Sequence, residues 1–146
     1  NQIYDAFLHD DKSKTFFHGH SYTGNPIACS AGLASLDLLL QDETLHSINR
    51  IAQQHASFAD KAKQLEYVKE VRQQGTILAV EFEAGGTSYF SNLRDRLYNF
   101  ALEHGVLLRP LGNIIYIIPP YCITEEQLEQ VYQTILGMHE LVAKAQ

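Results

Sequence analysis

A polar, glycine-bearing loop that runs directly into a long apolar helix constrains this chain more than any other stretch. The loop, residues 18–25, reads His-Gly-His-Ser-Tyr-Thr-Gly-Asn, and an almost continuous apolar run follows over residues 26–40. Asn25 is a favourable N-cap, and Pro26 suits the first helical position, where its missing N–H has no consequence. The pattern predicts a helix over residues 26–40 and, because helix N-termini attract negative charge, an anion site in the loop before it.

The predicted helix carries apolar or small side chains on nearly every side. Such a helix packs against neighbours over most of its surface, which is hard to arrange in a chain of 146 residues. We therefore expect a further domain or a partner subunit to cover it, and the lack of an initiator Met indicates a piece of a longer protein. Ser30, Ser35 and Asp37 interrupt the run, so we expect no membrane helix, which needs about 18 apolar residues.

The charge and the cysteine content narrow the class of protein. A net charge of −6 without any run of Lys and Arg argues against binding a nucleic-acid backbone. Hydrophobic content of 45% with 19% charged residues is typical of a folded domain rather than a disordered segment. Cys29 and Cys122 lie in apolar surroundings without metal or redox spacing, so we expect reduced, buried thiols in a cytoplasmic protein.

Apolar periodicity over the rest of the chain predicts a small α+β fold. We expect strands over residues 15–18, 67–72, 76–83, 106–108 and 113–118, and helices over 42–64, about 90–104 and 124–142. Thr124 and Gln127 match a capping box at the start of the last helix, and Gly105 suits the end of the helix before it. The order of elements predicts a mainly antiparallel sheet with helices on one face.

The strand over residues 76–83 alternates between apolar and polar side chains. Leu78, Val80 and Phe82 fall on the face that we expect to be buried. Glu81 and Glu83 fall on the other face, and we interpret them as a solvated surface rather than as an acid–base pair.

Arg109 is the most unusual charge in the sequence, because apolar strands are predicted on both sides of it. An arginine cannot give up its charge, and burying it unpaired is costly. No acidic residue lies within the ten positions after it, so a buried Arg109 needs a distant partner or a ligand carboxylate. The alternative is an arginine at a strand end that reaches solvent. Tyr116 either lines the same pocket or is a core tyrosine with a bonded hydroxyl.

The loop at residues 18–25 has three interpretations. The hydroxyls of Ser21, Tyr22 and Thr23, together with backbone amides, suit a phosphate. An ordinary polar turn before a capped helix accounts for the same residues. His18 and His20 are spaced to share a face, but nothing fixes a third ligand, so we expect no metal.

Two long segments resemble class III pyridoxal-phosphate aminotransferases. His-Gly-His-Ser-Tyr-Thr-Gly-Asn-Pro-Ile-Ala-Cys at residues 18–29 is similar to the family's cofactor-phosphate segment. Gly-Val-Leu-Leu-Arg-Pro-Leu-Gly-Asn-Ile-Ile-Tyr-Ile-Ile-Pro-Pro-Tyr at residues 105–121 is similar to its C-terminal strand pair. The resemblance covers the chain as the C-terminal third of a fold-type-I enzyme. It implies the end of the large cofactor domain over residues 1–25, connecting helices over 26–64 and the small domain over 65–146.

The resemblance also implies roles for individual residues. Ser21 and His20 would bind the phosphate of pyridoxal 5′-phosphate, with Ser21 in place of the family's usual threonine. Gly19 would line the substrate site, and Arg109 would pair with the carboxylate of the keto-acid substrate, a small molecule. The family's phosphate segment reaches the cofactor of the neighbouring subunit, so the resemblance implies a homodimer.

The sequence departs from the family at one essential point. The lysine that carries the cofactor precedes the phosphate motif by a few dozen residues in these enzymes, whereas only Lys12 and Lys14 precede it here. We therefore expect no transamination by these 146 residues alone. Members acting on ornithine, 4-aminobutyrate or ω-amino acids, and a non-enzymatic module derived from the family, remain open.

Overall fold

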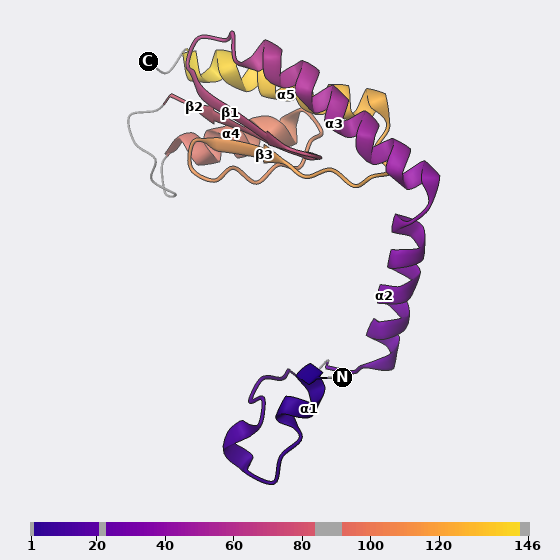
Figure 1. Ribbon diagram of the computed structural model, residues 1–146. Coiled ribbons are helices and arrows are strands. Elements are labelled where there is room, and N and C mark those ends of the chain that lie inside the picture. The colour runs from indigo at the N-terminus through magenta and orange to yellow at the C-terminus, as the bar shows by residue number, and fades with distance from the viewer. Residues whose placement is uncertain (1, 21–22, 84–91, 144–146) are drawn as a thin grey trace. The chain divides into compact units, whose positions relative to one another are not determined.

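The computed structural model describes residues 2–20, 23–83 and 92–143. The chain divides into two compact units, Asn1–Leu39 and Leu40–Gln146, shown in Figure 1. The domain boundaries expected from the resemblance, after residues 25 and 64, stay predictions.

The first unit consists of short local elements and one longer helix. It contains helix α1 (Gln2–Phe7), a 3-10 turn (Lys12–Lys14) and helix α2 (Pro26–Leu39). The predicted start of α2 is confirmed, because the Asn25 side-chain oxygen accepts hydrogen bonds from the N–H groups of Ile27 (2.9 Å) and Ala28 (3.2 Å). The strand predicted over residues 15–18 is wrong, since the backbone closes a tight turn there, with His18 N–H donating to the Phe16 carbonyl at 2.9 Å.

Helix α2 has no buried residue. The exposed fractions of its large side chains include 80% at Ile27 and 65% at Leu33. No described helix is long and apolar enough to cross a membrane. The first unit by itself thus leaves the apolar surface of α2 uncovered, and the expectation that a further domain or a partner subunit covers it stays a prediction.

The second unit is an α+β fold around a three-stranded antiparallel sheet of order β1-β2-β3. Its elements, in order, are α3 (Asp42–Ala62), β1 (Val68–Gln74), β2 (Ile77–Phe82), α4 (Asn92–Glu103), β3 (Ile114–Ile117) and α5 (Glu125–Ala143). Gly75, with φ +55°, makes the hairpin turn between β1 and β2. The predicted capping box at the start of α5 is confirmed, since Thr124 and Gln127 exchange hydrogen bonds of 3.0 and 3.2 Å.

The strand predicted over residues 106–108 is wrong. Gly105, at φ +72°, ends α4, and the Val106 N–H then donates to the Ala101 carbonyl at 2.9 Å. Residues 106–110 consequently belong to no helix or strand and lie outside the described sheet. The predicted start of α4 near residue 90 lies outside the described residues.

One face of the sheet and all three helices of the second unit share a single core. Leu78, Val80 and Phe82 of β2 point to this face, as predicted, and are at most 1% exposed. Helices α3 and α5 lie side by side over it (Figure 1), where the rings of Phe58 and Tyr132 stack with centroids 4.3 Å apart. The predicted arrangement, with helices on one face of an antiparallel sheet, is confirmed.

Candidate anion loop and carboxylate groove

The loop before α2 is held by contacts among its own residues. The His20 N–H donates to the Thr23 hydroxyl oxygen at 3.2 Å, and that oxygen lies 2.8 Å from His20 Nδ1. The Thr23 N–H donates to the His20 carbonyl at 3.0 Å, and Gly24 has a φ of +68°. Ser21, the predicted phosphate ligand, lies outside the described residues. The contacts of Thr23 link it to His20.

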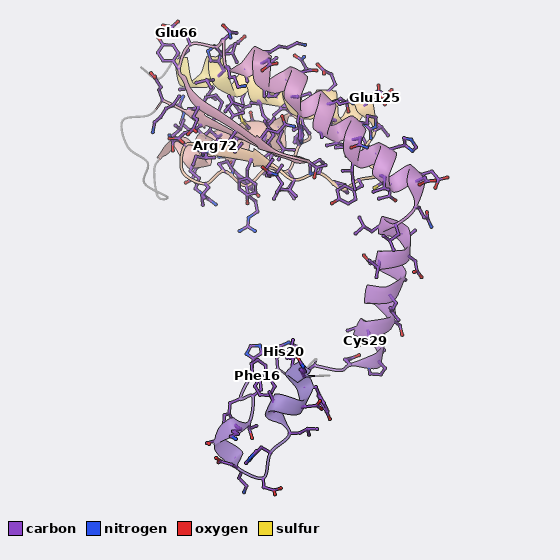
Figure 2. The ribbon with its side chains drawn as sticks, in the orientation of Figure 1. Phe16, His20, Cys29, Glu66, Arg72 and Glu125 are labelled. Atoms are coloured by element: carbon purple, nitrogen blue, oxygen red, sulfur yellow. The ribbon has the colours of Figure 1, made fainter. Side chains whose placement is uncertain are left out.

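Aromatic and imidazole rings lead into this loop. The ring centroids of Phe16 and His18 are 5.6 Å apart, and those of His18 and His20 are 6.3 Å apart. Figure 2 labels Phe16 and His20 in this part of the chain. No group of three His, Cys, Asp or Glu side chains in the described ranges has the spacing of a metal site.

The N–H groups available to an anion differ from those expected at a helix N-terminus. Asn25 already occupies the N–H groups of Ile27 and Ala28. By contrast, the backbone N–H groups of Gly19, Gly24 and Asn25 make no hydrogen bond within the described part of the chain. A Cβ added to Gly19 would meet no atom within 4 Å, so the backbone there is open to an approaching group. An anion at this loop would be bound by loop amides and not by the first turn of α2.

Arg109 borders a groove in the second unit. The groove has a volume of about 300 Å³, and its lining is predominantly apolar, including Leu108, Ile118, Pro119 and Val131. The Arg109 side chain is exposed and makes no hydrogen bond or ion pair with any described residue. Burial of Arg109 between two strands is wrong, because its side chain is exposed and the segment before it is not part of the sheet, whereas its pairing with a ligand carboxylate stays a prediction.

Tyr116 of β3 lines the same groove. It is half-buried, and its hydroxyl makes no hydrogen bond with the described residues. The alternative of a core tyrosine with a bonded hydroxyl is therefore wrong, and the alternative of a shared pocket with Arg109 is correct. The register explains this: Tyr116 pairs with Ala79, so it points to the face of the sheet opposite the core.

The same outer face carries a buried carboxylate that the sequence pattern assigned to solvent. Glu81 is 7% exposed, and its oxygens accept from Lys69 Nζ at 2.7 Å and from Arg72 Nη1 at 3.2 Å. Hydrogen bonding from Lys69 lowers the pKa of Glu81, against the opposing effect of burial. A β-bulge between Val68 and Glu70 accompanies this arrangement. The predicted solvated face at Glu81 is thus wrong.

The family model for class III aminotransferases matches residues 1–138. The chain belongs to this family. Two of its relatives are adenosylmethionine-8-amino-7-oxononanoate aminotransferases. That of Synechococcus elongatus is 38% identical over 136 residues, covering 93% of this chain and 32% of the relative. That of Geobacter sulfurreducens is 43% identical over 138 residues, covering 88% and 30%.

A solved structure agrees with this assignment. The crystal structure of the aminotransferase of the same name from Methanocaldococcus jannaschii superposes with a TM-score of 0.80 at 30% identity, over 98% of this chain and 33% of that one. The chain spans about a third of the length of the curated relatives it matches. Membership of the class III family and the α+β fold expected from the sequence are therefore confirmed.

One polar cluster of this class III aminotransferase chain could not be found from sequence patterns. His55 of α3 is fully buried, and its Nδ1 accepts from the Tyr132 hydroxyl at 2.7 Å while its Nε2 donates to the Thr76 carbonyl at 3.1 Å. Burial lowers the pKa of His55, opposed by the hydrogen bond to Thr76, and burial also raises the pKa of Tyr132. The cluster joins α3 and α5 to the hairpin and lies inside the core.

The cysteines also differ from expectation. Cys29 and Cys122 are both free thiols, but both are exposed. The prediction that they are buried is wrong, because α2 carries no buried residue and Cys122 lies in the turn before α5.

Proposed function

We propose that this chain is the C-terminal part of a pyridoxal-phosphate-dependent aminotransferase that transfers an amino group from S-adenosylmethionine to 8-amino-7-oxononanoate, giving 7,8-diaminononanoate for biotin synthesis. The observation that carries the proposal is the similarity to enzymes of this name over most of this chain, at 38% and 43% identity. The Tyr-Thr pair at residues 22–23 and the Ile-Tyr-Ile-Ile-Pro-Pro-Tyr run at 115–121 favour this member over those acting on ornithine, 4-aminobutyrate or ω-amino acids.

Arg109 is the proposed ligand of the substrate carboxylate. Its exposed guanidinium has no partner among the described residues and borders a mostly apolar groove, so it is available to donate charge-assisted hydrogen bonds to a carboxylate. The planar guanidinium also donates two parallel hydrogen bonds to a carboxylate, which lysine cannot do.

His20 and Ser21 are the proposed ligands of the cofactor phosphate. The loop fits this group chemically, because residues 18–25 contain no acidic side chain and the N–H groups of Gly19, Gly24 and Asn25 have no protein acceptor in the described ranges. When bound, pyridoxal phosphate supplies the electron sink for amino transfer, and the protein supplies orientation and electrostatics. The cofactor-linked lysine would be contributed from outside these residues.

The proposed assembly is a homodimer in the cytoplasm, in which the loop of one subunit serves the cofactor bound in the other. Gly19 would then also line the substrate site. The uncovered apolar surface of α2 supports an assembly, since exposed apolar patches of this kind mark interfaces. The cytoplasmic location rests on the two free thiols alone.

Growth without biotin tests the activity. The complete gene product containing this chain should restore growth to a bacterium that lacks its own adenosylmethionine-8-amino-7-oxononanoate aminotransferase. The purified product should aminate 8-amino-7-oxononanoate faster than other keto substrates. A gene that encodes no cofactor-linked lysine segment would instead identify a non-enzymatic module. Equal rates on all keto substrates would assign another class III activity.

The variant Arg109→Ala tests the carboxylate role. Loss of a hydrogen-bonded charge pair with the substrate should raise the KM for 8-amino-7-oxononanoate by about 100-fold, from about 3 kcal/mol of lost interaction. Arg96→Ala, on the exposed side of α4, is the matched control and should leave the KM unchanged. A change in expression or solubility without a change in KM would contradict the role of Arg109.

A further inference from the structure

The groove beside Arg109 carries two polar groups that no described residue satisfies. One is the Arg109 guanidinium, and the other is the Tyr116 hydroxyl. The two residues come from different segments, since Arg109 lies between α4 and β3 and Tyr116 lies in β3. They border one cavity of about 300 Å³ whose remaining lining is apolar.

The composition of this lining restricts what the groove can bind. Arg109 is the only charged residue in it, and no acidic side chain borders it. The groove therefore suits a ligand with one anionic end and an uncharged, apolar body, because a cationic group inside the groove would meet no acidic partner there. An aliphatic chain ending in a carboxylate has this chemistry.

Tyr116 is held so that its hydroxyl faces outward from the core. Its backbone pairs with Ala79 of the central strand, and Arg72 of β1 pairs with Ala79 from the other side. The Arg72 side chain is engaged by Glu70 and Glu81, so it is not available to the groove. Tyr116 is thus left as the hydrogen-bond donor on this row of the sheet.

From this geometry we propose that Tyr116 donates a second hydrogen bond to the carboxylate that Arg109 binds, and that the groove selects carboxylates carried on an aliphatic chain. Leu108, Ile118 and Pro119 supply the apolar surface against which the chain packs. In this arrangement Tyr116 determines specificity for the acceptor. The inference rests on the proposed function, because it takes the groove as part of the substrate site.

Tyr116→Phe in the complete, cofactor-loaded gene product tests the proposal, since it removes only the hydroxyl. We expect the KM for 8-amino-7-oxononanoate to rise about tenfold, as for loss of one hydrogen bond to a charged group, with kcat changed less than about twofold. With the analogue that has a methyl group in place of the carboxylate, the variant and the parent should have the same KM. Nonanoate, measured by calorimetry as a non-reacting ligand, should lose affinity by a similar factor.

Tyr121→Phe is the matched control, because Tyr121 is 41% exposed and does not line the groove. It should change neither KM nor nonanoate binding. Ile118→Asp provides a second variant that leaves the core intact, since Ile118 is 62% exposed, and the acid it places at the groove should weaken nonanoate binding by at least tenfold.

The outcomes separate this inference from the proposed function. If Arg109→Ala raises the KM but Tyr116→Phe and Ile118→Asp do not, Arg109 binds the carboxylate without the groove and the inference is overturned. If Arg109→Ala has no effect, the carboxylate role in the proposed function fails first. An equal effect of Tyr116→Phe on the acid and on its methyl analogue would show a general packing role and would also overturn the inference.

Discussion

The two compact units of this chain differ in where their stability comes from. The second unit buries a contiguous core between one face of a sheet and three helices. In the first unit, α2 has a sound N-cap and no buried residue. Local capping therefore suffices to start a helix but not to bury it. The two candidate sites differ in the same way: the groove lies in the unit that has a core, whereas the loop precedes a helix that has no buried residue.

The largest expected effect comes from removing core volume in only one of these units. Phe82→Ala in β2 should lower the free energy of unfolding by about 3–5 kcal/mol, because Phe82 is fully buried. Ile27→Ala in α2, where the side chain is 80% exposed, should change it by less than about 0.5 kcal/mol. Urea unfolding of the 146-residue chain measures both. Equal effects would mean that α2 is buried in solution.

A second prediction concerns the buried cluster of His55, Tyr132 and Thr76. Burial lowers the pKa of His55 in the folded chain, so the unfolded chain binds more protons in the window below the ordinary His value of about 6.5. The free energy of unfolding should thus fall as the pH falls below this value, with a slope of up to about 1.4 kcal/mol per pH unit. The slope ends once the pH is below the lowered pKa.

His55→Gln should abolish this part of the pH dependence, measured as the difference between parent and variant in urea midpoint at pH 7 and pH 5. His46→Gln in the first turns of the same helix is the control, because His46 lies outside the core. A parent whose midpoint is flat over this range would contradict a buried, neutral His55.

How far the sequence predicts this fold depends on the range of the interactions involved. Asn25 before Pro26, and Thr124 three residues before Gln127, determine helix starts through contacts within one turn, and both starts were predictable. The burial of Glu81 was not predictable, because it depends on Lys69 and Arg72 from the neighbouring strand. The exposure of Arg109 was not predictable either. Its apolar sequence neighbours marked it as unusual, but the predicted strand over residues 106–108 does not form because of the turn at Gly105.

The candidate sites show the same limit. The sequence pattern drew attention to Arg109 and Tyr116 separately, and only the register of β3 against β2 places Tyr116 on the outer face, at the groove. In the loop, Asn25 was correctly identified as a cap. Its occupation of the amides of Ile27 and Ala28 nevertheless moves the available N–H donors from the helix to the loop itself.

The smallest expected effect distinguishes the two caps. Thr124→Ala removes a hydrogen bond to the first turn of α5, a helix that supplies buried residues to the core, and should lower the free energy of unfolding by about 1 kcal/mol. Asn25→Ala removes two comparable bonds from α2, yet the midpoint of urea unfolding should not change, because α2 contributes no buried residue to a core. Its effect should appear only as a loss of helical circular dichroism. If Asn25→Ala shifted the urea midpoint as much as Thr124→Ala, the first unit would unfold together with the second. The two units would then differ in burial but would unfold as one cooperative unit.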